Sequence, residues 1–195
     1  MKHVLFCTLL GLLLFSLVGC GDDSPTAPTG GTEDTDIIDR FEGNFAADRW
    51  LKGAILEGTT SITPESGAAD SLVFAYHVSL GGGGVTERST SYELVASQNG
   101  TVTVDWRYQG HHAWYDAYVR GRCYVDGPQG ETVIPLVDND TVGGFDYSGE
   151  LTFDVYEGEV FGFEVAGGNF DSNSFIRGDL SLHGFRFDPA EAVED

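Results

Sequence analysis

Short runs in which apolar and polar residues alternate recur along most of the chain. In the clearest run, residues 101–108, Val102, Val104, Trp106 and Tyr108 alternate with polar residues. A period of two is typical of a half-buried antiparallel strand, because successive side chains point to opposite faces of a sheet. Similar runs, or short continuous apolar ones, occur at 41–45, 72–78, 91–96, 131–137, 151–155, 161–165 and 180–187.

A longer alternating run, residues 111–125, places Val119, Cys123 and Val125 on one face and Tyr118 with its polar neighbours on the other. Gly, Asn and Asp separate the runs, and the pair Asn99-Gly100 predicts a hairpin turn. No segment shows a convincing amphipathic helical period. About nine or ten short strands at regular spacing predict an all-β fold, a two-sheet antiparallel sandwich that resembles a jelly roll.

The first residues of the chain follow a different pattern. Lys2 precedes an uncharged apolar run, residues 4–18, which ends in Leu17-Val18-Gly19-Cys20. A basic start, a short apolar run and a small residue before the cut are typical of a secretory signal, and the run is too short to span a membrane. The stretch resembles bacterial lipoprotein signals, which implies that residues 1–19 are removed and that Cys20 carries the lipid.

The remaining chain divides by composition. Residues 20–36 contain no large apolar side chain after Cys20 and predict a disordered acidic tether. We expect a β-sandwich domain over residues 37–188 and an acidic tail over 189–195. Gly21 is not the acidic residue associated with retention in the inner membrane of enteric bacteria, which favours the outer membrane and leaves its periplasmic face and the cell surface open.

Charge and cysteine content narrow the functional classes. The chain has 31 Asp and Glu against 10 Lys and Arg, with a net charge of −21. Such a surface repels phosphate backbones, so we expect no nucleic-acid partner. Loss of residues 1–19 would remove Cys7, and lipid on Cys20 would leave Cys123 as the one free thiol. Its alternating run predicts a small core side chain rather than a nucleophile.

Four stretches of strand and turn residues stand out: GTVTVDWRY at 100–108, Tyr115-Asp116, SGELTFDVYEGEVFGF at 148–163 and GDLSLHGF at 178–185. Together they resemble a β-sandwich domain of exported bacterial lipoproteins and of surface proteins with sorting anchors. The resemblance covers about residues 40–188 and implies the fold. It implies no catalytic residues, because the family has no settled function and its shared motifs are strand and turn residues.

An aromatic and basic strip is the first candidate binding site. Flat aromatic faces beside polar groups are what sugar rings stack on, so the strip predicts polysaccharide binding; burial of half its rings in the core is the alternative. The candidate residues are Trp114, Tyr118, Arg120, Arg122 and Tyr124.

An acidic loop is the second candidate. Asp138, Asp140 and Asp146 offer carboxylates for a structural calcium ion, although Val142 and Gly149 stand where an EF-hand requires oxygen ligands. Plain turn chemistry is the alternative. His111-His112 is the one imidazole pair; neighbouring residues of a strand face opposite ways, so both could reach one metal only from a loop, and we expect solvated loop histidines.

No catalytic motif stands out. The chain lacks a GxSxG elbow and an HExxH helix, and its many carboxylates make any acidic pair uninformative. We therefore expect a non-enzymatic envelope lipoprotein with a binding or adhesion module, and the aromatic strip favours polysaccharide as its ligand. The open alternatives are a structural protein that binds another envelope protein and a glycan-active hydrolase.

Overall fold

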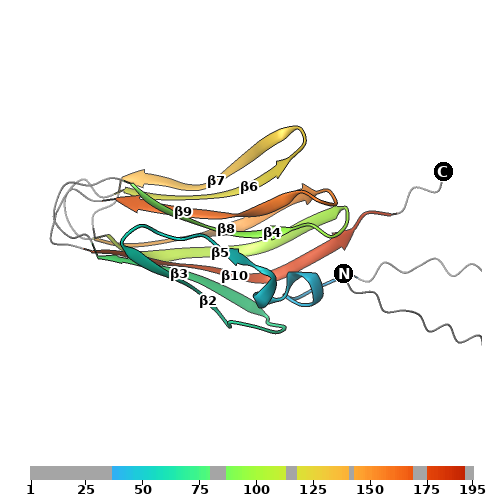
Figure 1. Ribbon diagram of the computed structural model, residues 1–195, viewed down its shortest axis with the longest axis horizontal. Coiled ribbons are helices and arrows are strands. Elements are labelled where there is room, and N and C mark those ends of the chain that lie inside the picture. The colour runs from blue at the N-terminus through green and yellow to red at the C-terminus, as the bar shows by residue number, and fades with distance from the viewer. Residues whose placement is uncertain (1–36, 80–86, 113–117, 141–142, 169–174, 192–195) are drawn as a thin grey trace, which may run out of the picture. The chain divides into compact units, whose positions relative to one another are not determined.

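A computed structural model describes residues 37–79, 87–112, 118–140, 143–168 and 175–191, all within one unit, Thr35–Asp195. The predicted signal, Cys20, the tether and Trp114 lie outside the described residues. Two five-stranded antiparallel sheets pack face to face (Figure 1). No helix in the described ranges is long and apolar enough to cross a membrane.

Sheet I has the order β2-β3-β10-β5-β8, and sheet II has the order β1-β4-β9-β6-β7. The strands of sheet I are β2 (Gly58–Thr63), β3 (Ser71–Ser79), β10 (Phe175–Pro189), β5 (Gly100–His112) and β8 (Gly143–Val155). Those of sheet II are β1 (Leu51–Lys52), β4 (Arg88–Val95), β9 (Val160–Gly168), β6 (Tyr118–Gly127) and β7 (Gly130–Asp140).

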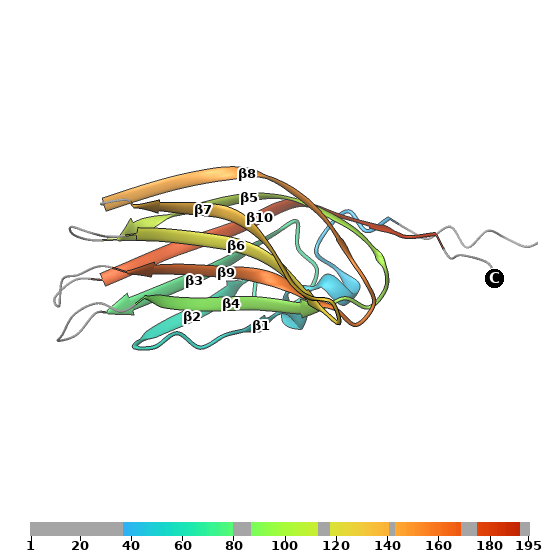
Figure 2. The ribbon, with the colours of Figure 1, turned by 90° about the horizontal axis from the view of Figure 1, so that it is seen from above.

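The connections make the sandwich a jelly roll and confirm the predicted fold class. From β3 to β10 the chain crosses between the sheets at every step except β6 to β7, which form a hairpin. The eight strands therefore alternate as β3-β10-β5-β8 in one sheet and β4-β9-β6-β7 in the other, with β1 and β2 added at one side (Figure 2).

Two local predictions were wrong. Residues 41–45 do not form a strand: Phe41 makes one bridge to Ala69, and Gly43–Phe45 is a 3₁₀ turn. The turn is permitted because Gly43 has φ of 57°, a left-handed conformation that costs glycine little. Asn99-Gly100 is not a hairpin turn, since β4 and β5 lie in different sheets. Instead Asn99 accepts backbone hydrogen bonds from Glu157 and Ala190.

The inward residues of both sheets form one aromatic-rich core. Phe74 of sheet I stacks on Tyr92 of sheet II with ring centroids 4.4 Å apart, and the Trp50 ring packs against Phe74 at 5.2 Å. Cys123 is fully buried there, as predicted, and burial raises the pKa of its thiol to about 12. The alternation in β5 and β6 thus correctly separated inner from outer side chains.

Candidate ligand-binding groove on sheet I

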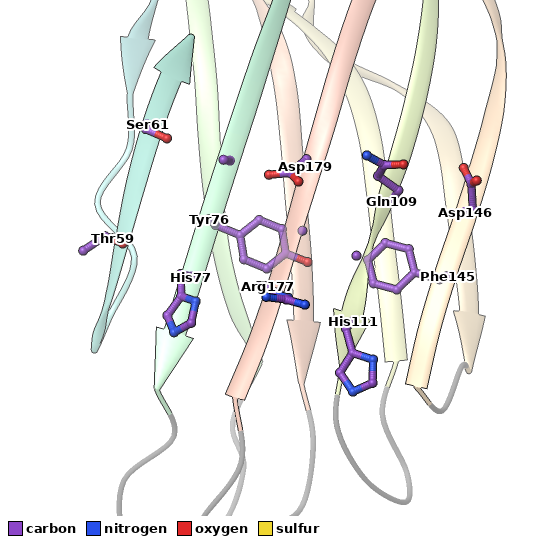
Figure 3. Close-up of a pocket in the computed structure, with 13 residues that line it drawn as sticks. Thr59, Ser61, Tyr76, His77, Gln109, His111, Phe145, Asp146, Arg177 and Asp179 are labelled. Atoms are coloured by element: carbon purple, nitrogen blue, oxygen red, sulfur yellow. The ribbon is translucent and has the colours of Figure 1, made fainter.

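A groove of about 480 Å³ lies on the outer face of sheet I. It crosses all five strands of the sheet near the end where β5 stops and β10 begins (Figure 3). Alternation along each strand turns the polar lining side chains outward, and antiparallel pairing brings them together. The polar lining consists of Thr59, Ser61, His77, Gln109, His111, Asp146, Arg177 and Asp179.

Two glycines shape the floor. Gly110 of β5 pairs with Gly178 of β10, and neither carries a side chain. A Cβ on Gly178 would lie 2.6 Å from the hydroxyl of Tyr76, and one on Gly110 would lie 2.6 Å from the Phe145 ring. Both sites thus require glycine, and the rings of Tyr76 and Phe145 behind them line the bottom of the groove (Figure 3).

One end of the groove carries an arginine, two histidines and an aromatic ring. Arg177 pairs in register with His77 of β3 on one side and with His111 of β5 on the other. Phe175 lies beside them, its ring centroid 5.8 Å from each imidazole, and its ring is nearly parallel to that of His77. The Arg177 guanidinium carbon lies 5.6 Å from the centre of the Phe175 ring, a cation–π distance. We call Arg177, His77, His111 and Phe175 the Arg177 row.

The next row of the groove carries hydroxyl, amide and carboxylate groups. Asp179 and Gln109 are paired neighbours, and both are half-buried. Asp146 receives two hydrogen bonds from Arg107, at 2.8 Å and 2.5 Å. These bonds lower the pKa of the Asp146 carboxyl, which is therefore ionised and neutralised by its partner.

A buried polar chain runs directly beneath the groove. The hydroxyls of Tyr108 and Tyr76 are 2.6 Å apart, and the Tyr76 hydroxyl is 2.6 Å from Nε2 of His112. On the other side of the ring, Nδ1 of His112 is 2.8 Å from the carbonyl oxygen of Tyr118. A carbonyl can only accept, so Nδ1 donates; neutral Nε2 then accepts from Tyr76, which in turn accepts from Tyr108.

The protonation states agree with this order. Burial lowers the pKa of His112 to about 4, so the ring is neutral at pH 7. Burial also raises the pKa of Tyr76 and Tyr108, which keeps both hydroxyls protonated as donors. His112 was expected in a solvated loop, and that prediction was wrong: it ends β5 with no exposed surface, and its neighbour His111 faces the groove.

The predicted aromatic strip lies on the opposite side of the sandwich. Tyr118, Arg120, Arg122 and Tyr124 occupy the outer side of β6 in sheet II. Tyr118 is half-buried, and Tyr124 is 7% exposed and lies against Gly162. Trp114 lies outside the described residues, so the strip as predicted stays a prediction.

The two arginines of that strip are already engaged within the chain. Arg120 bridges Glu87 and Asp138, with both nitrogen–oxygen distances at 3.0 Å. Arg122 bridges Glu131 at 2.9 Å and Glu164 at 3.1 Å. A smaller hollow of about 270 Å³ lies between these ion pairs.

The predicted calcium ligands are dispersed between the sheets. Asp138 of β7 is bound to Arg120 in sheet II, and Asp146 of β8 is bound to Arg107 in sheet I. Asp140 is exposed at the end of β7. No group of three His, Cys, Asp or Glu within the described ranges is placed to hold a metal ion. A calcium site involving these aspartates stays a prediction.

The groove was not found from the sequence. The alternation of 101–108 already put Arg107 on an outer face, and two more steps along β5 reach Gln109 and His111. Extending that pattern would have marked β5 as one wall. It would not have identified Thr59, His77 or Arg177, because strand pairing alone brings them to this wall.

Comparison with known proteins gives structural likenesses only. No family model matches the chain, and no curated protein matches it. A structure described for the promiscuous specificity of β-sandwich carbohydrate-binding modules is 12% identical over 72% of this chain and 57% of that one, with a TM-score of 0.37. This chain thus spans little more than half of its length.

Two further solved structures are carbohydrate-binding modules. One, described for specific mannan recognition, is 9% identical over 80% of this chain and 96% of its own, with a TM-score of 0.37. A family 11 module from Clostridium thermocellum, in complex with a mixed-linked tetrasaccharide, is 12% identical over 79% and 95%, with a TM-score of 0.30. Likenesses at this level assign no role to any residue of this chain.

Proposed function

We propose that the β-sandwich is a non-enzymatic module that binds polysaccharide in the groove on sheet I. The observation that carries the proposal is the lining of that groove. Hydroxyl, amide and carboxylate side chains, which hydrogen-bond to sugar hydroxyls, adjoin the flat ring of Phe175, on which a sugar can stack. The groove runs over the face of a sheet, which suits a polymer that enters and leaves at both sides.

The environment of Asp146, one carboxylate of the groove, favours binding over hydrolysis. A glycosidase requires one carboxyl group that stays protonated as a general acid, and its pKa must be raised. Asp146 has the reverse environment, because Arg107 lowers its pKa. This supports the non-enzymatic function over the alternative of a glycan-active hydrolase.

Affinity electrophoresis of the full chain in detergent, through gels that contain single polysaccharides, tests the proposal. One polymer should retard the wild type, and Gln109→Ala or Asp179→Asn should reduce the retardation. Gln129→Ala is the matched control, because Gln129 is exposed in the β6–β7 hairpin and outside the groove. Equal mobility in every gel would contradict polysaccharide binding.

Repeating the gels with EDTA tests the predicted calcium site, because removal of calcium should weaken the retardation.

We further propose that lipid on Cys20 anchors this module to the outer membrane through the acidic tether of residues 20–36. The lipoprotein-like pattern of residues 4–20 supports this. Cys20→Ser should move the protein from the membrane fraction to the soluble fraction and abolish incorporation of labelled palmitate. Cys7→Ser is the control, and an unchanged membrane fraction in Cys20→Ser would contradict the anchor.

A further inference from the structure

Arg177 differs from the other arginines of the two outer sheet faces. Arg107, Arg120, Arg122 and Arg186 each bind at least one carboxylate within 3.1 Å. Arg177 is exposed, and within the described ranges its guanidinium interacts with the ring of Phe175 rather than with a carboxylate. In a chain with 31 acidic and 10 basic residues, a cation on a sheet face that has no carboxylate partner in the described ranges is unexpected.

Two neighbouring histidines add further nitrogen-bearing side chains beside Arg177. His77 and His111 flank it in register on the two adjacent strands, so three nitrogen-bearing side chains stand in a line. Neighbouring strands lie about 4.8 Å apart, so this line spans roughly 10 Å across the groove. The nearer carboxylate of the groove, Asp179, belongs to the next row, and Asp146 is neutralised by Arg107.

The guanidinium group fits one ligand chemistry particularly well. Its planar fork binds a carboxylate or sulfate through two parallel hydrogen bonds, and it sheds water more easily than an ammonium group does. Contact with the Phe175 ring restrains Arg177 in the groove and thereby reduces the entropy lost on binding. At long range the net charge of −21 repels a polyanion, so attraction must come from this row at short range.

We infer that the groove selects an acidic glycan, whose carboxylate or sulfate group binds Arg177 between His77 and His111. Sugar hydroxyls then meet Gln109 and Asp179 in the next row. The inference rests on the proposed function and adds the class of polysaccharide.

The test compares acidic and neutral polymers at about 0.15 M salt, where screening confines charge effects to about 8 Å. The probes are polygalacturonate for carboxylate, κ-carrageenan for sulfate, and a mixed-linked glucan and a mannan as neutral polymers. Affinity electrophoresis and calorimetry are run on the full chain in detergent. The wild type should bind one acidic polymer at least roughly tenfold more tightly than either neutral one, a factor worth about 1.4 kcal/mol.

Three variants locate the contact. Arg177→Gln should lose roughly tenfold or more in affinity for the acidic polymer, and Arg177→Lys should recover part of it, since it keeps the charge but loses the fork. Arg186→Gln is the matched control: it lies on the same strand, at the other end, paired with Asp188. Melting temperatures verify that each variant is folded.

The outcomes separate the two proposals. Preference for the carboxylate or the sulfate polymer identifies the anionic group. Equal or tighter binding of a neutral polymer would overturn the acidic-glycan inference while supporting polysaccharide binding. Unchanged affinity of Arg177→Gln for the acidic polymer would also overturn the inference, and failure to bind every polymer would overturn both proposals.

Discussion

Among the described residues, His112 has no charged partner within hydrogen-bond distance, and its neutrality keeps the polar chain beneath the groove intact. Protonation would place a donor on Nε2, opposite the Tyr76 hydroxyl, which would then have to reverse its own hydrogen bond. The ring also packs edge-on against Phe145, with centroids 4.9 Å apart, so a charge there would face an apolar neighbour. At the scale of the residue, the fold therefore selects the uncharged imidazole.

His112→Gln should reduce the dependence of stability on pH. The folded pKa is about 4 against an ordinary value of 6.5, so the unfolded chain binds more protons between these values. The stabilisation is complete above pH 6.5 and is lost as the pH falls toward 4. In urea unfolding, the free energy of unfolding should fall by up to about 3 kcal/mol more for the wild type than for the variant between pH 7 and pH 4.

Comparing the two proteins cancels the contribution of the other titrating groups to the pH dependence. The carboxylates on the surface contribute equally to both proteins, so the difference between the two curves isolates His112. The variant should also be less stable at pH 7, because Tyr76 and the Tyr118 carbonyl lose good partners. Identical pH dependence in the two proteins would contradict a neutral, buried His112.

At the scale of the element, alternation predicted strands where one face is buried and the other is wet. It succeeded for β5 and β6, and the apolar run of 72–78 correctly marked β3 as central. It failed for residues 41–45, where backbone freedom at Gly43 overrides the pattern. It also missed β2, because β2 is an edge strand in which Ile62 is the one buried side chain.

The alternation of apolar and polar residues could not predict the groove. Its residues come from five strands that are up to about 120 positions apart in the chain, since Thr59 and Asp179 line the same wall. Alternation tells which face a side chain takes, but not which strand lies beside it or in which register. The buried state of His112 was hidden for the same reason: its partners are Tyr76 of the same sheet and the backbone of Tyr118 in the other.

Gly167→Ala should destabilise the junction of the sheets more than Gly121→Ala. Both glycines are buried in sheet II, in β9 and β6. A methyl group on Gly167 would run into the His112 ring, whereas one on Gly121 would meet Tyr108 at 3.4 Å, an ordinary contact. Urea unfolding should show a loss of about 1–3 kcal/mol for Gly167→Ala and less than about 1 kcal/mol for Gly121→Ala. Equal losses would contradict the tight fit around His112.

At the scale of the whole molecule, acidic charge dominates. Most of the described arginines on the sheet faces form ion pairs with neighbouring carboxylates, as Arg120 and Arg122 do. The remaining acidic groups repel one another across the surface, which opposes compaction. Burial of the apolar core must therefore outweigh the repulsion among the surface charges for the chain to fold.

Raising the concentration of NaCl from about 0.01 to 0.3 M should increase the melting temperature. Salt shortens the range of the repulsion between surface charges to less than about 10 Å. Salt also weakens the exposed ion pairs, but these contribute little to stability, so little stability is lost. A rise of a few degrees corresponds to about 1 kcal/mol for a domain of this size. KCl should act equally, and a falling melting temperature would show that the ion pairs outweigh the repulsion.

The position of β10 has a mechanical consequence. The chain enters the sandwich at Ile38, which bridges to Phe187 near one end of β10, whereas Arg177 lies near the other end, roughly 33 Å away at about 3.3 Å per residue. If the N-terminal segment is anchored as proposed, tension between it and a polymer in the groove would pass through the Ile38–Phe187 bridge and along β10. Because β3 and β5 pair with it on both sides, that tension loads two hydrogen-bond ladders in shear, so their bonds share the force rather than breaking one after another.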